Sequence, residues 1–281
     1  MIIDFHTHVF PAFFRKDRTR FFSDEPAFKL LYASSKSKLT GARSLIDHMD
    51  AEGVHRSVIF GFPWRKTDHF RRHNDYILDM MQKFPDRLIG FCCFDPLSRD
   101  AAGETERCLK AGLKGIGELA VYDSDFSAPI ISGFDESMGI AYHYEVPVLV
   151  HCNEPVGHQY PGKTAMTLRQ LYQFLKTFPK NNIVLAHWGG GLMFYALMKK
   201  EVQDTLKNVW FDTAASPFLY QPKIYRIAED MIGPDKILFG SDYPLINPSR
   251  YFQDIDAVAP SPESIARIKG GNAAHLLGLN S

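Results

Sequence analysis

The feature that most constrains the fold of this chain is an alternation of short apolar runs with amphipathic stretches. Eight runs of five to seven residues recur along the sequence, and most are continuously apolar, as parallel strands covered on both faces should be. The stretches between them carry apolar residues at the i, i+3, i+4 spacing of helices. The pattern predicts eight βα units, with strands at residues 2–8, 56–62, 88–94, 115–119, 146–152, 182–188, 209–215 and 236–242.

Eight such units suit two architectures, a closed barrel and an open doubly wound sheet. An open sheet of the dinucleotide-binding kind would carry a G-x-G-x-x-G loop after its first strand, and this sequence has none there. The length of 281 residues suits one (β/α)8 barrel, which typically uses about 250 residues. Because no Pro/Gly linker divides the chain, we predict a single α/β domain over residues 1–281, folded as a TIM barrel.

Composition and charge exclude several classes of protein. Lys plus Arg and Asp plus Glu both total 32, so no net charge favours nucleic acid or an anionic membrane as partner. No apolar run approaches the ~18 residues of a membrane span, and the start MIIDFHTHVF lacks the basic segment of a signal peptide. The four cysteines show no C-x-x-C spacing. We therefore expect a cytoplasmic protein with reduced thiols.

The first apolar run ends in two histidines, His6 and His8. Residues i and i+2 of a strand point to the same face, so both imidazoles face one point, where they can bind one divalent ion. Asp4 lies on that face as well, either as a partner of the ligands or as an acceptor for buried backbone donors. An H-x-H motif alone arises often by chance, so the interpretation depends on the later runs.

Four later runs end in residues that commonly bind metals, namely Glu118, His151, His187 and Asp242. Glu118 and His151 are 33 residues apart (151 − 118), and His151 and His187 are 36 apart (187 − 151), about one βα unit each. In a barrel the C-terminal ends of all strands meet on one rim, so these side chains would converge. Each of them alone is more often structural, but together with His6 and His8 they favour a shared metal site.

On these motifs the sequence resembles the amidohydrolase superfamily, in particular its amidohydrolase 2 branch, over essentially the whole chain. DFHTH matches the D-x-H-x-H opening of that family, and HMDAEGVHRSVIF resembles its first helix and second strand. LVHC, LAHWGG and LFGSDYP resemble strands five, six and eight, and GGNAAHLLGL resembles the closing helix. The resemblance implies a (β/α)8 barrel of the metal-dependent hydrolase type.

The resemblance also implies roles for individual residues. It implies a metal-ligand set of His6, His8, Glu118, His151, His187 and Asp242. Glu118 stands where two-metal hydrolases of the superfamily carry a bridging carboxylated Lys or Glu. His187 would bind the second metal in two-metal members and act as a catalytic acid or base in one-metal members. Asp242 and His187 are therefore the expected catalytic residues.

This ligand set serves two reactions. The leading prediction is hydrolysis of an ester, lactone, amide or phosphoester bond in a small organic molecule, because zinc lowers the pKa of bound water to about 7 and Asp242 can take the proton of that water. The alternative is nonoxidative decarboxylation of an aromatic or unsaturated carboxylic acid. A barrel that binds a ligand without catalysis ranks last, because all expected ligands are present. We expect one or two divalent ions, zinc before manganese.

Two long connections should lie over the catalytic face. The first, from Val9 to Gly41, carries a basic cluster that offers one means of binding an anionic substrate: Arg15, Lys16, Arg18 and Arg20. The second follows His151, and its His158, Tyr160 and Lys163 either line the pocket or form an ordinary surface loop.

Other residues carry weaker indications. Strand-end aromatic residues suggest a pocket for a flat organic molecule: Phe62, Trp64, Phe94, Trp188 and Tyr243. Four further histidines lie among charged residues, and we expect them to be exposed or structural: His48, His55, His69 and His73. The resemblance also allows a homodimer, as in many relatives.

Overall fold

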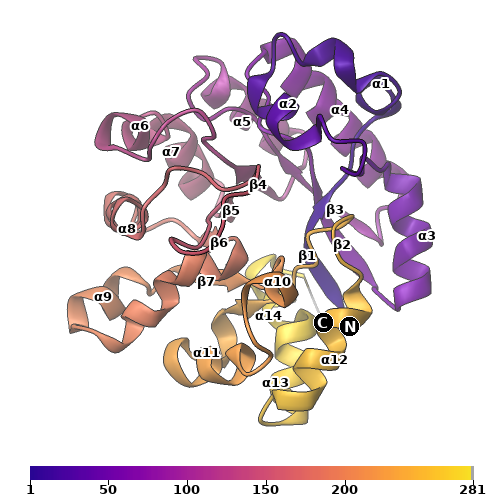
Figure 1. Ribbon diagram of the computed structural model, residues 1–281. Coiled ribbons are helices and arrows are strands. Elements are labelled where there is room, and N and C mark those ends of the chain that lie inside the picture. Colours follow the sequence, from indigo (N-terminus) through magenta and orange to yellow (C-terminus); the bar gives the residue numbers. More distant parts are fainter. Residues whose placement is uncertain (280–281) are drawn as a thin grey trace.

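The barrel closes through contacts between its first and last strands. The computed structural model describes residues 1–279 and contains one eight-stranded parallel sheet in the order β1 to β8 (Figure 1). The amide of Phe5 donates to the carbonyl of Phe239 at 2.8 Å, and Thr7 pairs with Tyr243 in a parallel bridge. This arrangement confirms the predicted (β/α)8 barrel. The strands are β1 (Ile3–His8), β2 (Arg56–Phe60), β3 (Leu88–Cys92), β4 (Gly115–Leu119), β5 (Val148–Val150), β6 (Ile183–Leu185), β7 (Val209–Asp212) and β8 (Ile237–Leu238).

The strands β5, β6 and β8 fall furthest short of the lengths that the sequence predicts. They span three, three and two residues, because the backbone leaves the sheet before it reaches His151, His187 and Asp242. The backbone of His187 has a φ of 54° and that of Asp242 a φ of 59°. Such positive φ angles are uncommon for residues other than glycine and are concentrated at functional sites. Apolar runs therefore overestimate strand length where the chain turns to aim a side chain.

Helices form the outer layer, and capping residues mark the ends of two of them. Gly53 ends α3 with a φ of 71°, and Thr167 begins α8 with a capping box to Gln170. No helix within residues 1–279 has the length and apolarity needed to cross a bilayer. The helices are α1 (Ala12–Arg15), α2 (Pro26–Tyr32), α3 (Ala42–Glu52), α4 (Thr67–Lys83), α5 (Ala101–Lys110), α6 (Ala128–Ser132), α7 (Asp135–His143), α8 (Leu168–Thr177), α9 (Lys200–Thr205), α10 (Ser216–Leu219), α11 (Ile224–Ile232), α12 (Pro248–Val258), α13 (Pro262–Ala266) and α14 (Asn272–Leu276), with short turns η1 (Arg18–Phe21), η2 (His187–Leu197), η3 (Pro234–Lys236) and η4 (Arg267–Gly271).

Two glycines allow the close approaches that shape the catalytic rim. A Cβ atom at Gly117 in β4 would lie 2.3 Å from the carbonyl oxygen of Leu149 in β5. A Cβ atom at Gly240, just after β8, would lie 2.7 Å from the Cβ of His6. Real Cβ atoms do not approach that closely, so a larger residue at 240 would displace His6.

The connection between β1 and α3 folds into short helices around an aromatic cluster. Phe14 of α1 stacks on Trp64 with ring centroids 4.3 Å apart, and Phe28 of α2 lies 4.5 Å from the same indole. All three side chains are fully buried. This packing fixes α1 and α2 over one side of the barrel mouth (Figure 1).

Candidate metal centre

Four donor atoms converge beyond the ends of β1, β4 and β8. They are Nε2 of His6 and His8, Oε2 of Glu118 and Oδ1 of Asp242. Nε2 of His6 lies 3.3 Å from Nε2 of His8 and 3.6 Å from each carboxylate oxygen. Nε2 of His8 lies 3.6 Å from Glu118 and 3.5 Å from Asp242. The fold thus brings together four predicted ligands that are up to 236 positions apart in sequence (242 − 6).

The spacing and chemistry of these atoms suit a divalent cation. Ligand atoms about 2.1 Å from a tetrahedral ion lie about 3.4 Å from one another, and the five distances given above run from 3.3 to 3.6 Å. All four atoms are acceptors when the histidines are neutral, so they repel one another unless positive charge lies between them. The residues present therefore fit a bound metal ion.

The second nitrogen of each strand-one histidine is held by a neighbour. Nδ1 of His6 donates to Oδ2 of Asp212 at 2.7 Å, and Nδ1 of His8 donates to the carbonyl of Gly61 at 3.3 Å. A proton fixed on Nδ1 leaves the lone pair of Nε2 free, and the hydrogen bond sets the angle of the ring. Both rings are therefore held in the orientation that a metal ligand needs.

Asp212, at the end of β7, is a part of this centre that the sequence prediction missed. It is fully buried, and its Oδ1 accepts hydrogen bonds from the backbone amides of His187 at 2.9 Å and Ala214 at 3.0 Å. One carboxylate therefore positions a ring on β1 and the chain beyond β6. The available signal was its place as the carboxylate that ends the apolar run VWFD.

Glu118 links two groups of histidines through its two oxygens. Oε2 faces His6 and His8, whereas Oε1 lies 2.8 Å from Nδ1 of His151 and 3.5 Å from Nε2 of His187. One donor atom each of Glu118, His151 and His187 lies within 4.8 Å of the other two, which gives a second candidate ligand group. All six predicted ligands thus lie in one centre, joined by this carboxylate.

The connection between β5 and α8 contacts this centre through its backbone. Nε2 of His151 donates to the carbonyl of Gly162 at 2.8 Å. The loop is closed at its base, where Oδ1 of Asn153 accepts from the amide and hydroxyl of Thr164, both at 2.8 Å. The predicted position of this loop beside the catalytic rim is therefore correct.

The predicted polar side chains of this loop bind one another. Glu154 accepts hydrogen bonds from the hydroxyl of Tyr160 at 2.8 Å and from Nζ of Lys163 at 3.1 Å. The Lys163 ammonium also donates to the carbonyl of Val156 at 2.6 Å, and His158 is exposed. These contacts hold the loop together, and a pocket-lining role for the three residues stays a prediction.

Charges within the centre shift the pKa values of its histidines and carboxylates. Burial alone would lower the pKa of His6, but the charges of Asp212 and Glu118 outweigh it and raise that pKa well above its usual value. Burial would raise the pKa of Asp242, yet the neighbouring imidazoles of His8 and His6 lower it to about 2. The pKa of Glu118 likewise lies well below normal, because His151 and His6 outweigh burial. Both carboxylates are therefore ionised.

Asp4 accepts hydrogen bonds that hold the rim in place and is not one of the converging donor groups. Its carboxylate accepts from the amide of His6 at 3.2 Å and from the amide and hydroxyl of Ser241. Burial raises the pKa of Asp4 to about 7, although the Ser241 hydrogen bonds oppose the shift. Of the two predicted roles, the structure shows the second, an acceptor for buried donors.

The basic cluster of the first connection binds its own loop. Nε of Arg15 donates to the carbonyl of Phe10 at 2.9 Å, and Arg18 donates to the carbonyl of Ser37 at 2.8 Å. The guanidinium of Arg20 lies over the ring of Phe13 at 4.7 Å. These guanidinium groups stabilise the loop, so the hypothesis that the cluster binds an anionic substrate has no support from its contacts.

The strand-end aromatic residues divide between the core and the centre. Trp64 packs in the aromatic cluster of the first connection, and Trp188 donates from Nε1 to Ser216 at 3.0 Å in the core. Phe62 instead stacks on Tyr122, whose ring lies 5.7 Å from that of His151. Only part of the predicted aromatic rim therefore approaches the metal centre.

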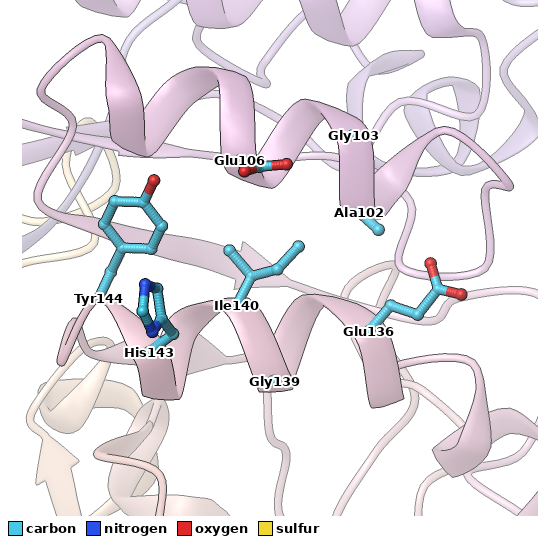
Figure 2. A pocket seen from close by; sticks show the side chains of 8 residues that line it. All are labelled: Ala102, Gly103, Glu106, Glu136, Gly139, Ile140, His143 and Tyr144. Atoms are coloured by element: carbon cyan, nitrogen blue, oxygen red, sulfur yellow. The ribbon is translucent and has the colours of Figure 1, made fainter.

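A separate hollow lies on the outer layer between α5 and α7 (Figure 2). Small residues such as Gly103 and Gly139 open it, and Glu106, Glu136 and His143 are exposed around it. Glu106 already pairs with Lys110 at 2.7 Å. The hollow shares no residue with the metal centre.

Known proteins resemble this chain over most of its length. The family model described as amidohydrolase matches residues 3–279. A curated gamma-resorcylate decarboxylase from Polaromonas sp. (strain JS666 / ATCC BAA-500) is 24% identical over 268 residues, which cover 77% of this chain and 78% of that protein.

Two solved structures show the same fold. The 5-carboxyvanillate decarboxylase of Sphingomonas paucimobilis superposes with a TM-score of 0.78 at 17% identity and covers 99% of both chains. The dihydroxybenzoic acid decarboxylase of Polaromonas sp. JS666, solved with bound manganese and 2-nitroresorcinol, has a TM-score of 0.74 at 21% identity. It covers 100% of this chain and 97% of its own.

These relatives correct the predicted reaction. The leading prediction, a hydrolase that uses metal-activated water, is wrong, because the curated relatives are decarboxylases. The alternative prediction, a decarboxylase, is the one they favour. The prediction relied on Glu118 as a mark of two-metal hydrolases, and a ligand set of this kind does not by itself fix which bond is broken.

Proposed function

This chain belongs to the amidohydrolase family, and we propose that it is a metal-dependent decarboxylase that removes the carboxyl group of an aromatic acid without oxidation. The observation that carries the proposal is the group of four donor atoms at the ends of β1, β4 and β8, in which the two histidine nitrogens lie 3.3 to 3.6 Å from each other and from the two carboxylate oxygens. The reaction class is supported by relatives named as decarboxylases of aromatic acids.

We assign the primary ion to His6, His8, Glu118 and Asp242. When bound there, a divalent ion would supply the positive charge that holds and orients an anionic substrate. Manganese is the first metal to test, because a structural relative was solved with manganese, and zinc suits the same ligands. Glu118, His151 and His187 lie close enough together for a second ion, but we assign one ion, which leaves His187 free to carry a proton.

His187 is the residue we assign to proton transfer. Its Nδ1 donates to the carbonyl of Ala214 at 3.1 Å, which leaves Nε2 facing the centre. Burial would lower the pKa of His187, but a hydrogen bond to Glu118 and the charge of Asp242 raise it to about 9. Nε2 therefore holds a proton at neutral pH.

The proton balance of the reaction requires such a donor. When the bond between the ring carbon and the carboxyl carbon breaks, carbon dioxide leaves, and the ring carbon takes up one proton. Nε2 of His187 would deliver that proton and recover it from solvent. Asp242 lies beside it, with one donor atom within 4.8 Å, and keeps the imidazolium charged.

The proposal is tested by decarboxylation of a panel of benzoic acids with and without ring hydroxyl groups. The full chain is stripped with a chelator and reconstituted with Mn²⁺ or Zn²⁺, and carbon dioxide and the decarboxylated product are measured. We expect turnover that requires metal and is lost in His187→Asn, a variant that keeps its metal. Protein that holds one ion per chain and releases no carbon dioxide from any acid would contradict the proposal.

A further inference from the structure

Two tyrosines outside the ligand set lie beside the metal centre on different connections. Tyr32 ends α2 in the connection after β1, and Tyr122 follows β4. The ring of Phe62 stacks on Tyr122 with an interplanar angle of 7° and centroids 6.2 Å apart, and Tyr32 meets Phe62 edge-on at 5.9 Å. The other side of Tyr122 faces His151 at 5.7 Å. The three aromatic rings form a wall next to the centre.

The hydroxyl groups of these tyrosines are not used by the fold. Within residues 1–279 neither hydroxyl has a hydrogen-bond partner in the protein, and both side chains are half-buried rather than sealed off. Tyr76 and Tyr251 contrast with them. The hydroxyl of Tyr76 accepts from the amide of Ala42 at 2.8 Å, and that of Tyr251 donates to the carbonyl of Ser241 at 2.8 Å. A half-buried polar group without a partner is available to a ligand.

Both hydroxyls can act as hydrogen-bond donors. A phenol has an ordinary pKa of about 10, so it carries its proton at neutral pH. The ring of Tyr122 lies 5.7 Å from that of His151, a residue of the centre, and Tyr32 joins the same wall through Phe62.

Tyr32 is held in place by its surroundings. Its ring packs against Phe28 at 4.9 Å and Phe10 at 5.4 Å. The guanidinium of Arg18 binds the Tyr32 carbonyl at 3.3 Å and the Ser37 carbonyl at 2.8 Å. Because this side chain is already fixed, it loses little conformational entropy when it binds a ligand. Its hydrogen bond therefore contributes more fully to the affinity.

We propose that Tyr32 and Tyr122 determine substrate specificity by donating hydrogen bonds to an oxygen substituent on the ring of an aromatic acid that lies at the edge of this wall. The inference rests on the proposed function, because the acid's carboxylate would lie at the metal centre. It names the residues of this chain that would recognise a ring hydroxyl group, and it gives a role to the basic loop cluster through Arg18, which anchors Tyr32.

The test compares the affinity for benzoate with that for its ring-hydroxylated forms, measured by calorimetry on manganese-loaded protein. Wild type should prefer a hydroxybenzoate, and Tyr32→Phe and Tyr122→Phe should each reduce that preference about tenfold, because a hydrogen bond to the oxygen of the ring hydroxyl is lost. Affinity for benzoate should stay within about twofold. Tyr172→Phe is the matched control, since its hydroxyl faces Thr205 on the outer layer at 3.3 Å.

The measurement separates this inference from the proposed reaction, because binding requires no turnover. If wild type shows no preference for any hydroxybenzoate, or if both variants keep the wild-type preference, the inference is overturned, while carbon dioxide release would still support the decarboxylase. If the variants lose the preference and no acid is decarboxylated, the recognition role stands and the reaction fails. Metal content and melting temperature verify that each variant is folded.

Discussion

Two fully buried histidines of this protein, His6 and His73, lie in regions with opposite chemistry. At the metal centre, Nδ1 of His6 donates to Asp212, and its Nε2 faces acceptors. In the aromatic cluster of the first connection, Nδ1 of His73 accepts from the indole of Trp64 at 2.9 Å and Nε2 donates to the carbonyl of Val9 at 2.7 Å. His73 has one donor and one acceptor as partners, which is all that a neutral imidazole requires.

The difference teaches that burial alone does not identify a metal ligand. Burial lowers the pKa of His73 to about 3, since no carboxylate opposes it, whereas Asp212 and Glu118 reverse the effect of burial at His6. A ring nitrogen left facing only acceptors is the distinguishing feature. We therefore predict that His6 is a metal ligand and that His73 is a structural residue, and each prediction below tests that contrast.

The largest expected effect is the loss of metal and activity in His6→Ala. Removal of one of four converging ligands should abolish stoichiometric metal binding at micromolar concentration and reduce decarboxylation by about a thousandfold or more. Elemental analysis of protein purified without chelator measures the first effect, and carbon dioxide release the second. His73→Leu is the paired variant and should keep its metal. Equal metal content in His6→Ala and wild type would remove the basis of the comparison.

The second effect belongs to the aromatic cluster. His73→Leu leaves the indole N–H of Trp64 and the carbonyl of Val9 buried without a partner, so we expect a loss of about 2 to 4 kcal/mol in the free energy of unfolding. Urea denaturation of metal-free protein measures it. Activity per folded, metal-loaded molecule should stay within about threefold of wild type, and a variant that folds normally yet loses its metal would show that His73 is not merely structural.

The sequence predicted the barrel and the convergence of the strand-end side chains because both depend on local pattern. Alternating apolar and amphipathic runs fix the number of βα units, and the C-terminal ends of parallel strands share one rim. The same pattern failed at the ends of β6 and β8, where His187 and Asp242 adopt positive φ angles that no apolar run reveals. It also left His73 undecided between exposed and structural, because the charged neighbours of His73 in sequence are not its neighbours in space.

Residues that act through a second residue were harder to predict. Asp212 contacts His6 from β7, 206 positions away, and no spacing rule links the two. Tyr32 and Tyr122 lie in connections, where periodicity carries no information, and they meet only through Phe62. The reaction itself was mispredicted, because the ligand set is shared by enzymes that break different bonds.

The third prediction asks how far the orientation of His6 depends on its partner. In Asp212→Asn an amide NH₂ can replace the oxygen that faces Nδ1 of His6, which moves the imidazole proton to Nε2, the nitrogen that should face the ion. Metal affinity should fall about 10- to 100-fold, with little change in the free energy of unfolding of metal-free protein. Competition with a metal-sensitive dye measures the affinity. Asp254→Asn, on α12 away from the centre, is the control.

The smallest effect is the pH dependence that His73 adds to stability. In the unfolded chain its imidazole takes up a proton near pH 6.5, whereas the folded protein keeps it neutral down to about pH 3. Between these values the unfolded state binds more protons, so acid favours unfolding and stability rises with pH. From pH 7 to pH 5 wild type should lose on the order of 1 to 2 kcal/mol relative to His73→Leu.

Comparison of the two proteins isolates this contribution, because the metal centre and every other titrating group are the same in both. The free energy of unfolding is measured for chelator-treated wild type and for His73→Leu at pH 7 and pH 5. The change with pH in wild type minus the change in His73→Leu is the contribution of His73. If the gap between the two proteins narrows as the pH falls, then His73 is a histidine kept neutral by an apolar cluster. Parallel pH curves would show instead that His73 takes up its proton over the same pH range in the folded and the unfolded chain, and the contrast with His6 would then lose its electrostatic basis.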